Sequence, residues 1–271
     1  MRSYTHICLL TVVSAAFSPP TSSAGDHLEF YKELNYPWVD KEGPLCLNET
    51  LCPQNPNYTW SSYFKYFLDK GVKNFVLGGL IMARSSIWFS GAFHSFDQWN
   101  LSAFIALRKE VRARGGRILG DLHDQQVERE GSFNKTLFRE NVDKFLQHFP
   151  VDGFRIKDFL PYSEQTTQHV KEALEVFNEM KLTSSIRVQP SQLDAFAKAK
   201  LGGIPKTTFL SLWPKYCDKE ETIAFNTDKF AEQAIKNATV AGVDPSKIVL
   251  ELHGGPVDDE LDMAESATQS L

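Results

Sequence analysis

Residues 149–160 read FPVDGFRIKDFL, and this stretch passes from the end of a helical pattern into a strand. Phe154 and Ile156 alternate there with Arg155 and Lys157, which is the period of a strand whose two faces meet different surroundings. Strand-like and helical runs alternate along the chain on both sides of it. We expect strands at 72–82, 117–122, 151–160, 185–188, 207–213 and 247–252, a faint first strand at 28–31, and helices at 101–114, 136–149, 163–180, 192–199 and 222–241.

This alternation predicts the α/β fold class. Parallel strands need crossover helices between them, and a repeat of roughly 30 residues is typical of a (β/α)8 TIM-type barrel. A doubly wound sheet would carry a G-x-G-x-x-G turn after its first strand, whereas Gly78 and Gly79 lie inside a strand-like run. The runs leave no residues for an eighth strand. We therefore expect a barrel that is incomplete at its C-terminal end, either open at one seam or cut from a longer chain.

Composition excludes two classes of protein. The chain has 271 residues, of which 42% are hydrophobic and 23% charged, and it contains 20 Phe and 5 Trp. Such a chain is not intrinsically disordered. Its net charge of −5, with no long Lys/Arg block, predicts no nucleic-acid partner.

Residues 1–24 resemble a secretory signal peptide. Arg2 precedes an apolar stretch at 7–17, and small residues at 22–24 form the exit from it. The stretch is shorter than the ~20 residues that span a bilayer, so we expect cleavage and no transmembrane segment afterwards. The mature protein is then a secreted, extracellular single domain at 25–271 with a polar tail at 256–271.

In an exported protein, sequons can be glycosylated and cysteines can form disulfides. Five N-x-S/T sequons predict a glycoprotein: Asn48, Asn57, Asn100, Asn134 and Asn237. Cys46 and Cys52 bracket a short turn and are the expected disulfide in an oxidising compartment. Cys217 then stays as the odd cysteine, either buried or free.

The stretch at 149–160 resembles the fourth barrel strand of the family-18 glycoside hydrolases, the chitinases and chitinase-like lectins, whose signature there is F/V-D-G-x-D-x-D-x-E. Residues 116–122 stand where this family has its third strand, and 241–250 resemble its entry into the seventh. The resemblance covers roughly residues 70–255. It implies a secreted chitinase-like barrel that takes no cofactor and binds a chitin-like or other oligosaccharide, or an extracellular protein.

Matched residue by residue, the catalytic motif is degenerate. Asp152 and Gly153 are kept, Arg155 and Lys157 replace the two later aspartates, and Phe159 replaces the catalytic glutamate. A benzyl ring has no proton to give to the leaving oxygen, and cations oppose an oxocarbenium-like transition state. We therefore expect a catalytically inactive protein.

The strand period also places Arg155, Lys157 and Phe159 in the barrel interior. Buried cations need partners, and Asp121 on the neighbouring strand is the nearest candidate. We therefore expect an Asp121–Arg155 or an Asp121–Lys157 ion pair. Two interpretations stay open. In the first, a structural repair, the basic residues that replace the catalytic acids pair with Asp121 and only stabilise the interior. In the second, these residues form a basic pocket that binds an anionic sugar. The structural interpretation is favoured, because charged groups in a protein interior usually find their partners within the protein itself.

Two alternatives retain enzymatic activity. Asp158 lies one position out of register, and the strand period turns it toward the helices unless a bulge brings it back as a displaced catalytic carboxylate. The other alternative is a metal-assisted hydrolase, because four candidate metal ligands follow the third and seventh strands: His123, Asp124, Glu251 and His253.

Tryptophans supply candidate sugar-stacking rings. Trp213 ends the sixth strand and suits a ligand-binding role, with core packing as the alternative. Trp88 and Trp99 are expected to flank the loop after the second strand. The apolar run at 87–89 anchors that loop, stacks on a sugar, or forms a patch for a partner protein.

Overall fold

The computed structural model describes residues 31–34, 60–89, 101–124, 133–157, 164–212 and 227–251. The strands are β1 (Tyr31–Leu34), β2 (Asn74–Ala83), β3 (Ser86–Phe89), β4 (Arg117–Asp124), β5 (Gly153–Lys157), β6 (Thr183–Val188), β7 (Thr207–Ser211) and β8 (Ile248–Glu251). The α-helices are α1 (Trp60–Asp69), α2 (Leu101–Ala113), α3 (Lys135–His148), α4 (Glu164–Glu179), α5 (Leu193–Lys198) and α7 (Asp228–Val240).

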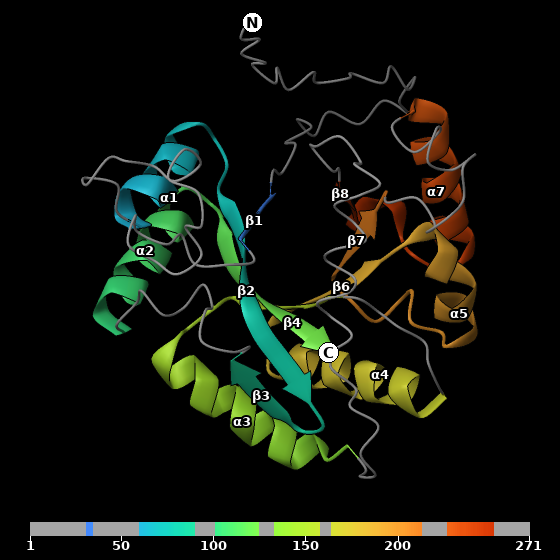
Figure 1. Cartoon of the computed structure of the whole chain (residues 1–271), viewed down its shortest axis with the longest axis horizontal. Coiled ribbons are helices and arrows are strands. Elements are labelled where there is room, and N and C mark those ends of the chain that lie inside the picture. Colours follow the sequence, from blue (N-terminus) through green and yellow to red (C-terminus); the bar gives the residue numbers. More distant parts are fainter. Residues whose placement is uncertain are drawn as a thin grey trace, which may run out of the picture.

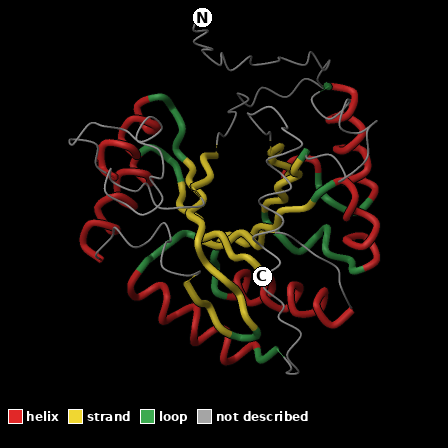
Figure 2. The backbone as a smooth tube through the Cα atoms, in the orientation of Figure 1, coloured by secondary structure: helices red, strands yellow, loops and turns green. Residues whose placement is uncertain are grey.

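The parallel strands follow one another in the order β1-β2-β4-β5-β6-β7-β8. Figures 1 and 2 show that they curl into an arc whose outer side is covered by the helices. Within the described residues, the hydrogen-bonded pairing runs from β1 to β8 and does not join these two end strands to each other. The predicted α/β barrel, incomplete in its closure, is confirmed.

Two elements differ from the sequence prediction. β1 continues to residue 34, beyond the predicted 28–31. The sequence pattern places Trp88 beside the loop after the second strand and does not predict β3: the chain turns back after β2, and Trp88 lies within β3, which pairs antiparallel to β2. Arg84 makes this reversal with a left-handed φ of 54°. A two-residue turn is too short to leave a clear break in the hydrophobic pattern.

The main core lies between the arc and the helices. Phe154 of β5 stacks on Phe177 of α4 with 4.9 Å between ring centroids, and it meets Phe145 of α3 at 5.6 Å. Helix boundaries follow local chemistry: Asn134 accepts a hydrogen bond from the backbone N–H of Leu137 at the start of α3. The described helices lack the combination of length and apolar character that a membrane span requires.

Close packing at Gly153 yields a stability prediction. A Cβ at this position would lie 2.1 Å from the carbonyl oxygen of Thr183 on β6. Gly153→Ala is therefore expected to lower the free energy of unfolding by about 2 kcal/mol or more. Gly203→Ala is the matched control, because no atom lies within 4 Å of its added Cβ. Urea unfolding measures both variants, and equal stability of the two would contradict the close approach of β5 and β6.

Candidate functional site

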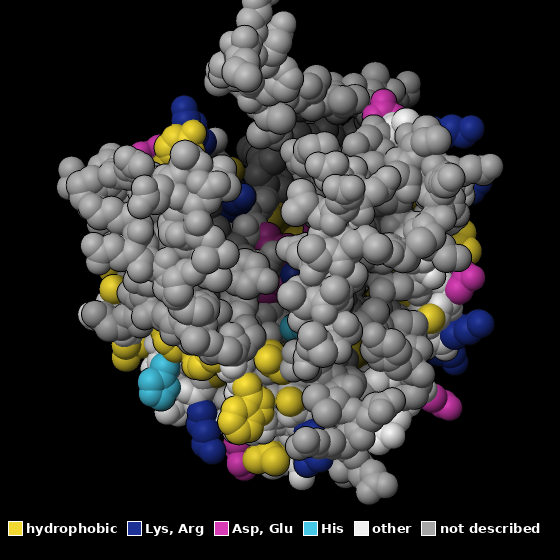
Figure 3. Space-filling view, in the orientation of Figure 1, with side chains coloured by type: hydrophobic (Ala, Val, Ile, Leu, Met, Phe, Trp, Pro, Cys, Tyr) yellow, Lys and Arg dark blue, Asp and Glu magenta, His cyan; other side chains and the backbone are white. Residues whose placement is uncertain are grey.

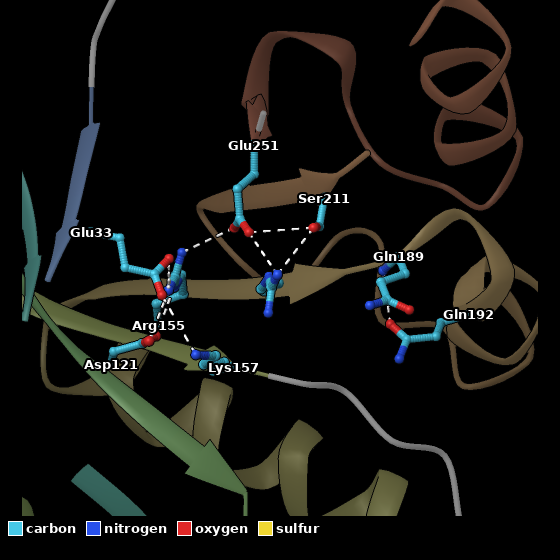
Figure 4. Close-up of polar contacts among 9 residues, drawn as sticks. Glu33, Asp121, Arg155, Lys157, Gln189, Gln192, Ser211 and Glu251 are labelled. Carbon is cyan, nitrogen blue, oxygen red and sulfur yellow. Dashed lines mark hydrogen bonds and ion pairs between the residues drawn. The ribbon is translucent and has the colours of Figure 1, made fainter. Parts of the chain in front are cut away.

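Strand β5 divides its side chains between two environments. Phe154 and Ile156 are buried in the core shared with the helices. Arg155 is equally buried, with 1% of its side chain exposed, but it lies on the inner side of the arc (Figure 4). The predicted alternation along β5 is confirmed.

The guanidinium of Arg155 contacts three carboxylates. Its Nε and Nη2 donate to the two oxygens of Asp121 on β4, at 2.7 and 2.8 Å, in the bidentate geometry that strengthens such pairs. Its Nη2 also lies 2.6 Å from Glu33 of β1, and its Nη1 donates to Glu251 of β8 at 3.2 Å. Figure 4 shows the three acids converging on Arg155. Of the two alternative ion pairs predicted for Asp121, the one with Arg155 is confirmed, and two further acids join it.

Two more cations complete the cluster. Arg187 of β6 lies 2.7 Å from Glu251 and donates to the hydroxyl of Ser211 on β7 at 3.2 Å. Lys157 lies 3.6 Å from Glu33. The ion cluster therefore consists of Glu33, Asp121, Arg155, Lys157, Arg187 and Glu251. Its three positive and three negative formal charges cancel. In the space-filling view, acidic and basic side chains lie together in the hollow at the centre of the face shown (Figure 3).

Burial and pairing oppose each other in this cluster. Burial alone would raise the pKa of Glu33, but the charges of Arg155, Lys157 and Arg187 and a hydrogen bond from Arg155 lower that pKa from 4.5 to about 2. Burial likewise disfavours the charged form of Arg155. The charge and hydrogen bonds of Asp121 outweigh it, so the pKa of Arg155 is raised. Both groups therefore stay charged at neutral pH.

An apolar layer adjoins the ion cluster on the inner side of the arc. The rings of Tyr31 and Phe209 meet edge to face at 5.0 Å, and they pack with Val76, Leu119 and Val249. The guanidinium carbon of Arg155 lies 5.1 Å from the centroid of the Phe209 ring, within the range of a cation–π interaction. This layer keeps water from one side of the cluster, which strengthens the ion pairs.

Asp152, the motif residue kept from the family pattern, lies just before the amino end of β5. Its carboxylate accepts hydrogen bonds from Arg108 and Arg112 of α2, at 3.1 and 2.8 Å, and from the backbone N–H of Ile118 at 2.9 Å. Asp152 therefore links α2 to β4 and to the start of β5 through hydrogen bonds, and it is not a member of the ion cluster.

The structure brings only some of the predicted site residues together. His123 lies on β4 in register with Lys157, while the side chain of Asp124 is not described. Among the described residues, no group of three or more His, Cys, Asp or Glu is arranged to hold a metal ion. The predictions for Asp158, Phe159, Trp99, Trp213, His253, Cys46, Cys52, Cys217, Asn48, Asn57 and Asn100 lie outside the described residues.

Sequence reasoning missed Glu33 and Arg187 as members of the cluster. The predicted first strand at 28–31 stops short of Glu33, although the pattern Tyr31-Lys32-Glu33 already places Tyr31 and Glu33 on one face. Arg187 lies inside a predicted strand, and the same period would have placed it beside Ser185 on one face. The sequence pattern does not predict how strongly the sheet curls, and this curl brings Glu33 of β1 and Glu251 of β8 to Arg155 of β5.

Comparisons with known proteins relate this geometry to a fold. No protein-family model and no curated protein sequence matches the chain. The putative chitinase A of Streptomyces coelicolor superposes with a TM-score of 0.50 and 12% identity, covering 66% of each chain. The chain has a chitinase-like fold. This agrees with the resemblance of the β5 segment to the family-18 glycoside hydrolases.

Two further solved structures are similar to the chain. Catalytic domain 2 of the Ostrinia furnacalis group II chitinase, solved with penta-N-acetylchitooctaose, has a TM-score of 0.46 and 14% identity over 67% of this chain. The class V chitinase from Nicotiana tobaccum, solved with NAG4, has a TM-score of 0.43 and 12% identity over 67% of this chain. This chain covers 56% and 60% of those two structures. At 14% and 12% identity, neither likeness indicates the activity or the ligand of this chain.

The lowered pKa of Glu33 predicts an acid-dependent loss of stability. Its pKa is about 2 in the folded protein against an ordinary 4.5, so its contribution, on the order of 3 kcal/mol, is complete above about pH 4.5. That contribution is lost as the pH falls toward about 2. Urea unfolding of wild type and Glu33→Gln between about pH 6 and about pH 2.5 measures the difference. The variant is expected to be less stable at the higher pH and to lose less stability on acidification.

Glu232→Gln, on the exposed face of α7, is the matched control and is expected to follow the wild-type pH dependence. Identical slopes for wild type and Glu33→Gln would show that Arg155 does not hold Glu33 in its charged form.

Proposed function

We propose that this chain is a chitinase-like protein that binds a neutral, chitin-type oligosaccharide and does not cleave it by the family mechanism. One observation carries the proposal. At the two β5 positions where the resemblance implies aspartates, the chain has Arg155 and Lys157, and both are engaged with carboxylates of the ion cluster.

Proton chemistry supports the loss of activity. The family mechanism requires a carboxylic acid near the bridging oxygen and a carboxylate that orients the acetamido group of the substrate. The Arg155 guanidinium cannot release a proton near neutral pH, and its pKa is raised further by Asp121. Proton transfer from a positioned acid contributes roughly 100- to 10,000-fold to such reactions, so hydrolysis should fall to background.

The charge balance favours a neutral ligand over an anionic one. Each cation of the ion cluster has a carboxylate within 4 Å: Arg155 contacts Asp121, Lys157 contacts Glu33, and Arg187 contacts Glu251. No excess positive charge is left among these six groups to attract a sulfate or a sugar acid. This supports the structural repair of the catalytic row over the basic pocket.

We also propose that the protein is exported and N-glycosylated. The apolar stretch at 7–17 and the five sequons support this proposal, and two of the sequon residues, Asn134 and Asn237, have exposed side chains. Expression of the full chain in a secreting eukaryotic cell should place it in the medium with a mass that falls after enzymatic removal of N-glycans. A protein retained in the cell without glycans would contradict this proposal.

An activity assay separates the proposed binding protein from an active hydrolase. The purified chain is incubated with a fluorogenic chitotriose, with and without EDTA, beside an active chitinase. We expect release of fluorophore at the background rate, because Phe159 stands at the position of the catalytic glutamate and has no proton to donate. Binding of chitohexaose, measured by isothermal titration calorimetry, is expected under the same conditions.

Two outcomes would contradict inactivity and identify the alternative. Turnover that disappears in Asp158→Ala but persists in the control Asp143→Ala, a change on the exposed side of α3, would establish a displaced carboxylate. Turnover that EDTA abolishes would establish a metal-assisted hydrolase.

A further inference from the structure

A line of paired residues leads from the ion cluster to the outer strand β3. Lys157 of β5 is in register with His123 of β4, His123 with Ile81 of β2, and Ile81 with Trp88 of β3. Directly paired residues on neighbouring strands point to the same face of a sheet. Trp88 therefore belongs to the same face as Lys157, which is the inner face of the arc.

The opposite face of the hairpin confirms this assignment. Leu80 and Met82 of β2 are buried against the helices, and their partners on β3 are Phe89 and Ile87. The Phe89 ring lies 5.9 Å from that of Phe149, which follows α3. Neighbouring residues of a strand alternate between faces, so Trp88, which lies between Ile87 and Phe89, points away from the helices.

A bulge in β2 makes this continuity possible. The register of β2 against β4 shifts between Leu77 and Leu80, where Gly79 has a left-handed φ of 90°. The extra residue changes the alternation, so that Val76 and Ile81 both face inward although an odd number of positions separates them. Without the bulge, Trp88 would point into the helix layer.

The side chain of Trp88 is open to solvent. Its side chain is 61% exposed, while Phe89, next to it on the other face, is 40% exposed and contacts Phe145 and Phe149. An aromatic ring that is open to solvent on the inner face is accessible to a ligand bound along that face.

We propose that Trp88 stacks on one sugar ring of a neutral oligosaccharide that lies along the line Trp88–Ile81–His123–Lys157. The aromatic face is apolar and carries the negative side of the ring quadrupole, which suits the C–H face of a pyranose. The line crosses three strand spacings, or about 14 Å, so a chain of several sugar units fits along it. His123 and Lys157 supply polar groups for sugar hydroxyls at its inner end. This inference rests on the proposed oligosaccharide-binding function.

The test compares the affinity of the full chain and its variants for chitohexaose by isothermal titration calorimetry. Trp88→Ala is expected to weaken binding about tenfold or more, as expected for loss of a central aromatic contact, and Trp88→Phe should recover most of the affinity. Tyr66→Ala is the matched control, because Tyr66 is an aromatic residue with 56% exposure and belongs to α1, a helix on the outer side of the arc (Figure 1). Thermal unfolding should show that all three variants fold like the wild type.

The outcomes separate this inference from the proposed function. Wild-type binding with equal affinity in Trp88→Ala would overturn the stacking site and leave the binding function standing. Loss of affinity in both Trp88→Ala and Tyr66→Ala would also overturn it, because the effect would not be specific to the inner face. Failure of the wild type to bind chitohexaose would overturn the proposed function, and the stacking site with it.

Discussion

The buried guanidinium of Arg155 contacts carboxylates from three strands, and two of these, β1 and β8, are the end strands of the parallel order. Backbone pairing within the described residues does not join β1 to β8. Glu33 and Glu251 instead meet through one cation that β5 holds at the centre of the arc. The curl of the sheet and the position of this cation therefore depend on each other.

The same interaction supports our proposal that this site does not cleave glycosidic bonds. A buried charge is tolerated only when it is paired and hydrogen-bonded, and Arg155 meets that condition with Asp121, Glu33 and Glu251. Acids that hold a guanidinium in this way are not free to donate protons to a substrate. The positive and negative charges of the ion cluster balance, which is consistent with our proposal of a neutral ligand.

Much of this arrangement follows from local sequence. The alternation of Phe154, Arg155, Ile156 and Lys157 predicts both faces of β5, and the need to pair a buried cation predicts Asp121 as its partner. Both depend only on strand period and on a neighbouring strand. The βα alternation likewise predicts the barrel, because parallel strands leave few other solutions.

The rest depends on geometry that no single segment encodes. Glu33 lies in a short strand far from β5 in sequence, and only the curl of the sheet brings it to Arg155. The orientation of Trp88 depends on a β2 bulge at Gly79 and on a two-residue reversal, and neither changes the hydrophobic pattern enough to be recognised. Long-range register and single-residue irregularities are what the sequence pattern leaves undetermined.

The free energy of unfolding of Arg155→Met tests the central role of the guanidinium most directly. Removing the cation leaves Asp121 buried without its partner, so urea unfolding at neutral pH should show a loss of about 3–5 kcal/mol. Adding Asp121→Leu should recover part of that loss. Lys206→Met, which removes an exposed hydrogen bond to the carbonyl of Leu182, should cost less than about 1 kcal/mol. An Arg155→Met protein as stable as the wild type would contradict the account.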